Sequence, residues 1–187
     1  MTLVFYDFET TGLNPFHDKI IEYAFLSGDE SITSLVKRTQ ELKPEIVKIT
    51  GIDNEMLKEN GISELQAKKN IMTWIKSLQQ KSGGLLYLVA HNNIGFDMIF
   101  FKKLFPEEID FINTHIRFLD SLYLAKVVMP RMRSFSMKTL TKIFGIESGN
   151  HRALGDTIAL KKVYTELIKK IHINFRNVDS VYELVTV

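Results

Sequence analysis

The sequence contains no cysteine among its 187 residues, and it has only four prolines and one tryptophan. Without cysteine the chain can form no disulfide bond, and a thiol nucleophile or a thiolate metal ligand is excluded. Low-complexity segments and internal repeats are also absent from the sequence. These absences exclude disulfide-stabilised and repeat architectures, and they favour one globular domain held together by its core.

Long apolar runs and a strong net charge are missing as well. No run approaches the roughly 20 apolar residues of a membrane-spanning helix, so we expect no membrane span. The opening segment MTLVFYD has no basic region followed by a long apolar stretch. We therefore expect no secretory signal and an intracellular location, cytoplasmic or nuclear. Lys and Arg number 24 against 22 Asp and Glu, and the net charge of +2 does not by itself indicate nucleic-acid binding.

The apolar pattern predicts a single α/β domain. Strands are expected over residues 3–7, 20–26 and 31–36, and Gly28 with Asp29 favours a hairpin between the last two. The later elements are a helix capped by Ser63, a strand over 85–90, a helix from residue 97, a strand near 117–119, and helices near 121–128, 136–144 and 160–171. A three-strand meander followed by α-β-α-β-α predicts a mixed five-stranded sheet flanked by helices.

Acidic side chains stand at three places where a core would not require them. Asp7 and Glu9 end the first strand, and because side chains alternate along a strand they project to the same side. Asp97 follows the strand over 85–90, while His151 and Asp156 precede and open the last helix. Singly, each has an ordinary interpretation as a solvated strand end, a first-turn helix acid or a loop histidine. Together they are expected to converge, because sites in α/β sheets gather beyond the strand ends.

Such a convergence predicts a metal site. Four ionised carboxylates carry about −4, and two divalent cations would supply the matching charge. Oxygen ligands favour Mg²⁺ or Mn²⁺ over zinc. Paired cations of this kind stabilise the attacking and leaving oxygens of a phosphoryl displacement.

Three segments resemble the motifs of the DEDDh 3′→5′ exonucleases, the family of bacterial proofreading subunits, ribonuclease T and oligoribonucleases. FYDFETTGL over 5–13 is similar to the first motif, AHNNIGFD over 90–97 to the second, and HRALGD over 151–156 to the third with its histidine. The resemblance spans about residues 3–168 and implies a ribonuclease H-like fold. We expect an exonuclease domain over 1–173 and a tail of unassigned role over 174–187.

The resemblance also implies roles at the matching positions. Asp7 would bridge two Mg²⁺ or Mn²⁺ ions, Glu9 and Asp156 would complete one site, and Asp97 would hold the second ion. His151 would be the general base in the hydrolysis of the phosphodiester nearest the 3′ end, releasing nucleoside 5′-monophosphates. Asp120 and Glu22 lie off the motif positions, and we interpret them as structural caps or ordinary polar contacts.

Substrate contacts are expected around the same site. By resemblance, Leu13 and Ile52 would flank the terminal base and Phe96 would stack near it, with core packing as the alternative for all three. Residues 10–12 and the Asn92 side chain would hold the terminal sugar. The full expected set is Phe8, Thr10, Gly12, Leu13, Ile52, Asn92, Phe96, Arg131 and Arg133.

Arg131 and Arg133 belong to a basic segment. Residues 121–146 contain five basic side chains and no acid, which indicates either a guide for a phosphate backbone or solvated helix faces.

The leading hypothesis for the function is an exonuclease that acts on single-stranded DNA or RNA ends. A non-catalytic nucleic-acid-binding module and a metal-dependent endonuclease are the alternatives, and a homodimer or a polymerase or repair partner is left open.

Overall fold

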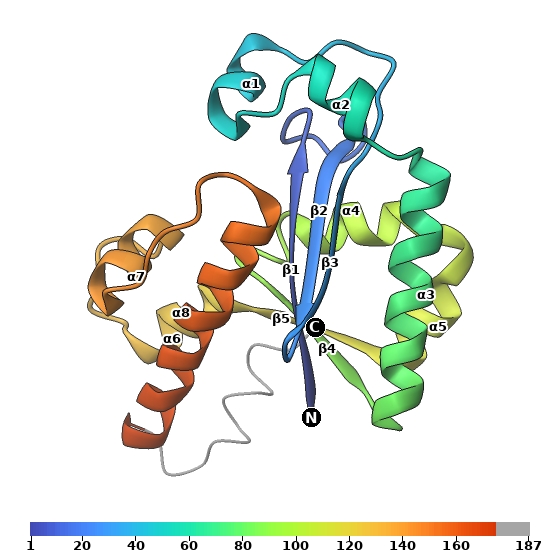
Figure 1. The fold of residues 1–187 in the computed structure, drawn as a ribbon. Coiled ribbons are helices and arrows are strands. Elements are labelled where there is room, and N and C mark those ends of the chain that lie inside the picture. Colours follow the sequence, from blue (N-terminus) through green and yellow to red (C-terminus); the bar gives the residue numbers. More distant parts are fainter. Residues whose placement is uncertain (175–187) are drawn as a thin grey trace.

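The computed structural model describes residues 1–174 of the chain and contains a five-stranded mixed sheet in the order β3-β2-β1-β4-β5 (Figure 1). The strands are β1 (Thr2–Thr10), β2 (Ile20–Ser27), β3 (Glu30–Leu35), β4 (Leu86–Ala90) and β5 (Ile116–Asp120). β2 runs antiparallel to β1 and β3, while β4 is parallel to both β1 and β5. The predicted meander and the predicted α/β class are confirmed.

The predicted helices are α3 (Glu64–Ser82), α4 (Asp97–Leu104), α6 (Ser121–Val128), α7 (Met137–Phe144) and α8 (Ala153–Asn174). Ser63 caps α3 as expected, since its side chain accepts a hydrogen bond from the Gln66 amide at 3.1 Å. The tail expected after α8 lies outside the described residues.

Four short elements were not predicted: α1 (Pro44–Thr50), α2 (Asn54–Asn60), the 3₁₀ turn η1 (Pro106–Glu108) and α5 (Ile109–His115). α1 and α2 lie beyond the end of the sheet toward which β1 points (Figure 1). Each has seven residues, which is too short for a helical period to stand out in a sequence. No helix within residues 1–174 is long and apolar enough to cross a membrane.

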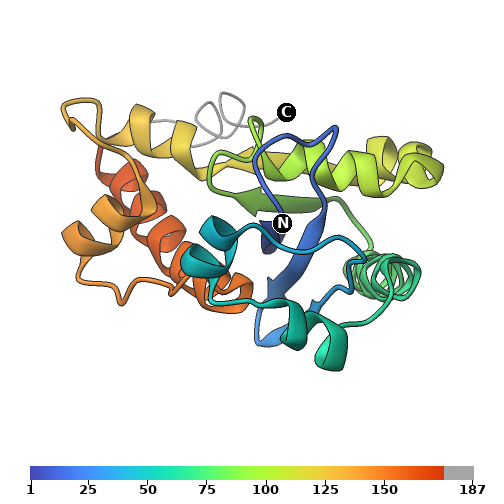
Figure 2. The same cartoon turned by 90° about the horizontal axis from the view of Figure 1, so that it is seen from above.

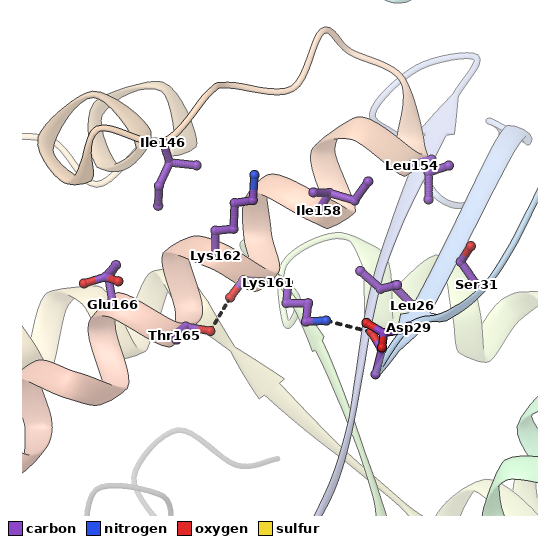
Figure 3. A pocket seen from close by; sticks show the side chains of 11 residues that line it. Leu26, Asp29, Ser31, Ile146, Leu154, Ile158, Lys161, Lys162, Thr165 and Glu166 are labelled. Atoms are coloured by element: carbon purple, nitrogen blue, oxygen red, sulfur yellow. Dashed lines mark hydrogen bonds between the residues drawn. The ribbon is translucent and has the colours of Figure 1, made fainter.

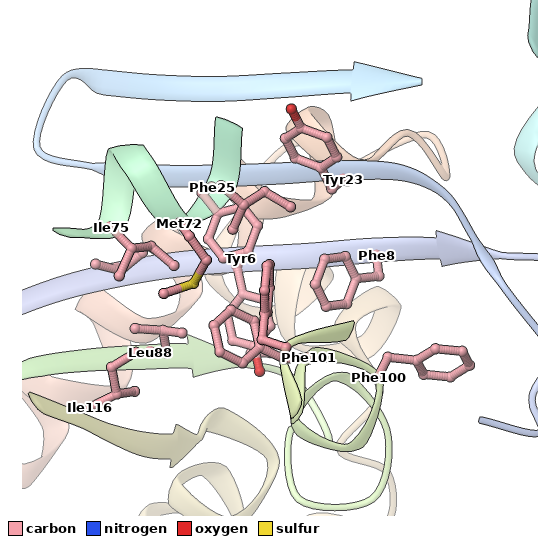
Figure 4. Packing of buried hydrophobic residues seen from close by; sticks show 14 of the residues in the cluster. Tyr6, Phe8, Tyr23, Phe25, Met72, Ile75, Leu88, Phe100, Phe101 and Ile116 are labelled. Carbon is pink, nitrogen blue, oxygen red and sulfur yellow. The ribbon is translucent and has the colours of Figure 1, made fainter. Parts of the chain in front are cut away.

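Helices cover both faces of the sheet, with α3–α5 on one side and α6–α8 on the other (Figure 2). The α3 side holds an aromatic core in which Tyr6 stacks on Phe25 with ring centroids 5.3 Å apart (Figure 4). Alternation along β1 sends Tyr6 and Phe8 into this core and Phe5 into the opposite core against α8. Asp7 has the same parity as Phe5, so the backbone directs it to the α8 side.

Candidate active site

Asp7 and Glu9 lie on the part of β1 that extends beyond its pairing with the parallel strand β4. β1 pairs with β4 only as far as Phe5, whereas its antiparallel pairing with β2 continues through Glu9. A register irregularity between Glu9 and Thr10 then ends the regular ladder. Beyond Phe5, the edge of β1 that faces β4 is therefore unpaired. The two carboxylates lie at this edge, where the loop that follows β4 can approach them.

Asp97 reaches this place from the first turn of α4. Its side chain is buried, and its Oδ1 has no hydrogen-bond partner within residues 1–174. The Phe8 backbone amide hydrogen-bonds to the same carboxylate, which places Asp97 directly beside β1. A buried carboxylate oxygen without a donor is costly, so this oxygen is chemically suited to a cation.

The fully buried Asp120 side chain fixes the loop between β4 and α4 by hydrogen bonds to its backbone. Its Oδ1 accepts from the Asn92 amide at 3.1 Å and the Leu122 amide at 2.9 Å, and its Oδ2 accepts from the Ile94 amide at 3.1 Å. Asp120 thus caps α6 and holds the loop, as its interpretation as a structural cap predicted.

The start of α8 brings the third group of side chains. His151 has a left-handed backbone with φ of 56°, and its amide hydrogen-bonds to the Asp156 carboxylate. A Cβ on Gly149 would lie only 1.6 Å from Asp156 Oδ1, so a glycine is required where the loop passes over that carboxylate. As a result Glu9, His151 and Asp156 offer ligand atoms that all lie within 4.8 Å of one another.

Burial and the crowding of acidic groups raise the pKa values of these four carboxylates. Burial, with a further contribution from Asp156, raises the pKa of Asp7 to about 8. Burial and the charge of Asp7 raise the pKa of Glu9 to about 9. The same two causes raise the pKa of Asp97 well above its ordinary value, and burial raises that of Asp156 against the opposing effect of His151. A site that disfavours its own negative charge in this way fits bound divalent cations.

Burial favours core packing for two of the predicted substrate contacts. The Ile52 side chain is 0% exposed within a cluster that includes Ile21 and Leu57, so it has no surface to offer a base. The Phe8 side chain is 4% exposed and packs edge-on against Tyr6. For both side chains the structure supports core packing instead.

Other predicted contacts have the required surface. Leu13 is 83% exposed, and Asn92 is exposed with φ of 64°. Phe96 is half-buried and packs on Phe100 with ring centroids 4.9 Å apart. Its ring thus contributes to the core and still has some exposed surface. Ile49, three residues before Ile52, is 53% exposed.

Residues 10–12 form a braced turn. The Thr10 hydroxyl donates to the Gly12 carbonyl at 2.6 Å, and Thr10 itself is buried. A Cβ on Gly12 would meet the Asp18 carboxylate at 2.5 Å. Since Asp18 also accepts from the Thr11 hydroxyl and the Asn14 amide, the turn that carries Leu13 has a fixed shape.

Arg131 and Arg133 are exposed in the loop between α6 and α7. His91 ties this loop to the end of β4, because its ring hydrogen-bonds to the Ser121 hydroxyl at 2.9 Å and to the Phe135 backbone. The basic loop is therefore anchored at the strand end from which the Asn92 loop departs.

One surface pocket of the described residues lies away from these side chains. A pocket of about 600 Å³ separates α8 from the β2–β3 turn and is lined by Leu26, Ile158 and Lys161 among others (Figure 3). None of the five predicted catalytic residues lines it. Its position away from the acidic residues gives it no part in the candidate site.

Comparison with known proteins identifies the family. The RNase T family, described as exonuclease, matches residues 4–164 of the chain. The chain belongs to the RNase T exonuclease family. This membership confirms the predicted family resemblance, and it agrees with the predicted ribonuclease H-like fold.

Relatives in this exonuclease family are mostly longer. The PolC-type DNA polymerase III of Bacillus cereus is 31% identical over 179 residues, which cover 91% of this chain and 12% of that protein. The Arabidopsis thaliana exonuclease DPD1, chloroplastic/mitochondrial, is 32% identical over 89% of this chain and 56% of its own length. The chain thus spans about an eighth of the polymerase and about half of DPD1.

Solved structures agree on the fold of the family. Escherichia coli exonuclease I in complex with a dT13 oligonucleotide superimposes with a TM-score of 0.77 at 20% identity, covering 92% of this chain and 42% of that one. A zinc-bound form of the same exonuclease in complex with single-stranded DNA gives 0.76 at 23% identity.

Proposed function

We propose that the chain is a 3′→5′ exonuclease that hydrolyses single-stranded DNA from its 3′ end with two Mg²⁺ or Mn²⁺ ions. The observation that carries this proposal is the convergence of Asp7, Glu9, Asp97, His151 and Asp156 from β1, α4 and the start of α8. Family membership supports the exonuclease chemistry, and the geometry supports the residues that would perform it.

The electrostatics support a division into two cation sites. The charge of Asp7 raises the pKa of both Glu9 and Asp97, so Asp7 lies close enough to share a ligand role with each of them. Glu9 and Asp156 would hold one ion with Asp7, and Asp97 would hold the other, with its unpartnered Oδ1 as a donor. Bound divalent cations would acidify the attacking water and stabilise the charge on the leaving oxygen.

His151 is suited to take the proton of that water. Its imidazole is exposed to solvent but lies within 4.8 Å of carboxylates on β1 and α8. The free nitrogen of a neutral imidazole can accept the proton of the water during attack, and the exposed ring can return it to solvent afterwards. Its backbone is left-handed with φ of 56°, two residues before α8 begins, and its ring nitrogen lies beside the Glu9 and Asp156 carboxylates.

Single-stranded DNA is supported as the substrate by two observations. Escherichia coli exonuclease I, which shares the fold, was crystallised with a dT13 oligonucleotide, and the PolC-type relatives are DNA polymerases. On this chain, exposed Leu13 and Ile49 offer apolar surface to an unpaired base, and Arg131 and Arg133 offer charge to phosphates.

A digestion of 5′-labelled single-stranded DNA tests the proposal. With Mg²⁺ we expect a ladder that shortens from the unlabelled 3′ end, release of nucleoside 5′-monophosphates, and full arrest by EDTA. A circular single strand is the matched control and should stay intact.

Three outcomes would overturn the proposal. A strand that shifts on a native gel without shortening would indicate a binding module. Cleavage of the circle would indicate an endonuclease. Digestion of a matched RNA strand with DNA left intact would exclude DNA as the substrate.

A further inference from the structure

Glu22, which no motif includes, forms the densest set of hydrogen bonds at the edge of the site. Its side chain is only 5% exposed on β2. Its carboxylate accepts from Arg152 Nη2 at 2.7 Å and from Arg152 Nε at 3.1 and 3.2 Å. It also accepts from the Ala153 amide, the first of α8, at 2.9 Å.

These bonds leave Glu22 no free oxygen with which to bind a cation. Oε1 receives both Arg152 nitrogens, and Oε2 receives Arg152 Nε and the Ala153 amide. A carboxylate held by a guanidinium fork and a helix N-terminus is saturated with donors. Glu22 is thus excluded as a ligand even though its charge is felt by Asp7, Glu9 and Asp156.

The position of Glu22 in the sheet connects the two halves of the site. Glu22 lies directly opposite Glu9 in the β1–β2 ladder. Arg152 is the immediate neighbour of His151, and Asp156 follows one helical turn after Ala153. One buried carboxylate therefore fixes where α8 begins relative to the strand that carries Asp7 and Glu9.

We propose that the Glu22–Arg152 pair is a positioning device that sets His151 and Asp156 against the β1 carboxylates, an inference that rests on the proposed function. Farther along α8, the helix packs on β1 and β2, and Lys161 Nζ donates to the Gly28 carbonyl in the β2–β3 turn at 2.6 Å. Packing fixes the helix against the sheet, but a fork of hydrogen bonds fixes its translation and its rotation about its own axis. Arg152 in addition places a positive charge beside Glu9.

Four variants test the proposal: Glu22→Gln, Arg152→Gln, the double variant, and Arg152→Lys. For either Gln variant we expect kcat to fall about 10–100-fold with little change in KM, the usual cost of losing a group that orients ligands. The affinity for Mn²⁺ measured by calorimetry without DNA should fall in the same range. Arg152→Lys should recover part of the loss, because charge is restored without the bidentate fork.

Two comparisons separate positioning from general stability. The double variant should be no worse than the poorer single variant, since either change breaks the same pair. Glu64→Gln is the matched control: it removes the carboxylate of a second arginine–glutamate pair among the described residues, Arg38–Glu64, which is also 2.7 Å long. That control should retain wild-type kcat and Mn²⁺ affinity.

Folded Glu22→Gln protein with wild-type kcat and Mn²⁺ affinity would overturn the proposal. A lowered Tm with both values unchanged would reduce the pair to a structural role and overturn it equally. If the wild-type protein shortens no oligonucleotide, the proposed function fails instead, and the Mn²⁺ titrations alone decide the role of the pair.

Discussion

At the scale of single residues, the site is destabilised by its own charges. The folded-state pKa of Asp7 is about 8 and that of Glu9 about 9, both well above the values of exposed carboxyls. When a folded-state pKa is raised, the folded protein binds protons more tightly than the unfolded chain. The cation-free fold therefore gains stability as pH falls below about 9, and it is least stable where both groups are ionised.

Asp7→Asn should raise the stability of the cation-free protein while abolishing turnover. At pH 9 the substitution removes a buried charge from beside Glu9 and Asp97, a relief on the order of several kcal/mol. With about 2–4 °C per kcal/mol for a chain of this size, Tm in EDTA should rise by several degrees. Thermal melts with EDTA and with Mg²⁺ measure it. An unchanged or lower Tm in EDTA would contradict the claim that repulsion among these carboxylates destabilises the cation-free fold.

His151→Gln should separate binding from chemistry. Loss of a general base lowers kcat by about 10²–10⁴-fold. The four carboxylates stay in place, so Mg²⁺ should still stabilise the fold and a labelled oligonucleotide should still bind. Single-turnover digestion and fluorescence anisotropy measure the two properties. Wild-type kcat in this variant would assign the proton transfer to another group.

At the scale of elements, the sequence predicted those with a clear apolar pattern and missed four short ones without such a pattern, for a physical reason. β4 is a continuous apolar run and α8 repeats its apolar stripe over several turns, so each pattern is visible without its partners. α1 has seven residues and its end depends on Gly51, whose φ is 67°. That left-handed turn redirects the chain, so that Ile49 is exposed and Ile52 enters the core.

Substitutions at these two isoleucines should have opposite effects. Ile52→Ala opens a cavity in a fully buried cluster and should cost about 2–5 kcal/mol of unfolding free energy. Ile49→Ala should cost less than about 0.5 kcal/mol, because its side chain is half exposed. Its KM for single-stranded DNA should rise, whereas that of Ile52→Ala should not. Urea unfolding and steady-state kinetics give both values, and a reversed pattern would restore Ile52 as the base contact.

His91 couples the end of β4 to α6 and the basic loop, and this coupling should depend on pH. Burial lowers the pKa of His91 below 6.5, so the unfolded chain takes up the proton first. This contribution to stability is complete above pH 6.5 and is lost as pH falls through the lower folded-state value. The pH 5–7 change in unfolding free energy should thus differ between wild type and His91→Gln, with the wild type losing more on acidification. Identical profiles would contradict a buried neutral imidazole.

The residues of the candidate site could be predicted where strand alternation or a sequence motif determines their position. Alternation along β1 already places Asp7 and Glu9 on one side, and the motifs supply Asp97, His151 and Asp156. The Glu22–Arg152 contact joins residues 130 positions apart, and nothing local marks either as a partner. The burial of Ile52 likewise follows from the packing of α1 and α2, which only the folded chain reveals.

At the scale of the whole molecule, a nearly neutral chain can still bind a polyanion. Of 22 acidic residues against 24 basic ones, four are proposed cation ligands; setting these aside leaves 24 against 18, or +6. Two bound divalent cations would compensate those four carboxylates. The loaded protein is accordingly expected to be more basic than its formal charge, and Arg131 and Arg133 are exposed in the α6–α7 loop.

The most direct test compares wild type with Asp7→Asn on 5′-labelled single-stranded DNA with Mg²⁺, after circular dichroism has shown both proteins to be folded. We expect the wild-type protein to shorten the strand stepwise from its 3′ end and the variant to leave it at full length. Digestion by the variant at the wild-type rate would contradict the assignment of the acidic cluster as the active site.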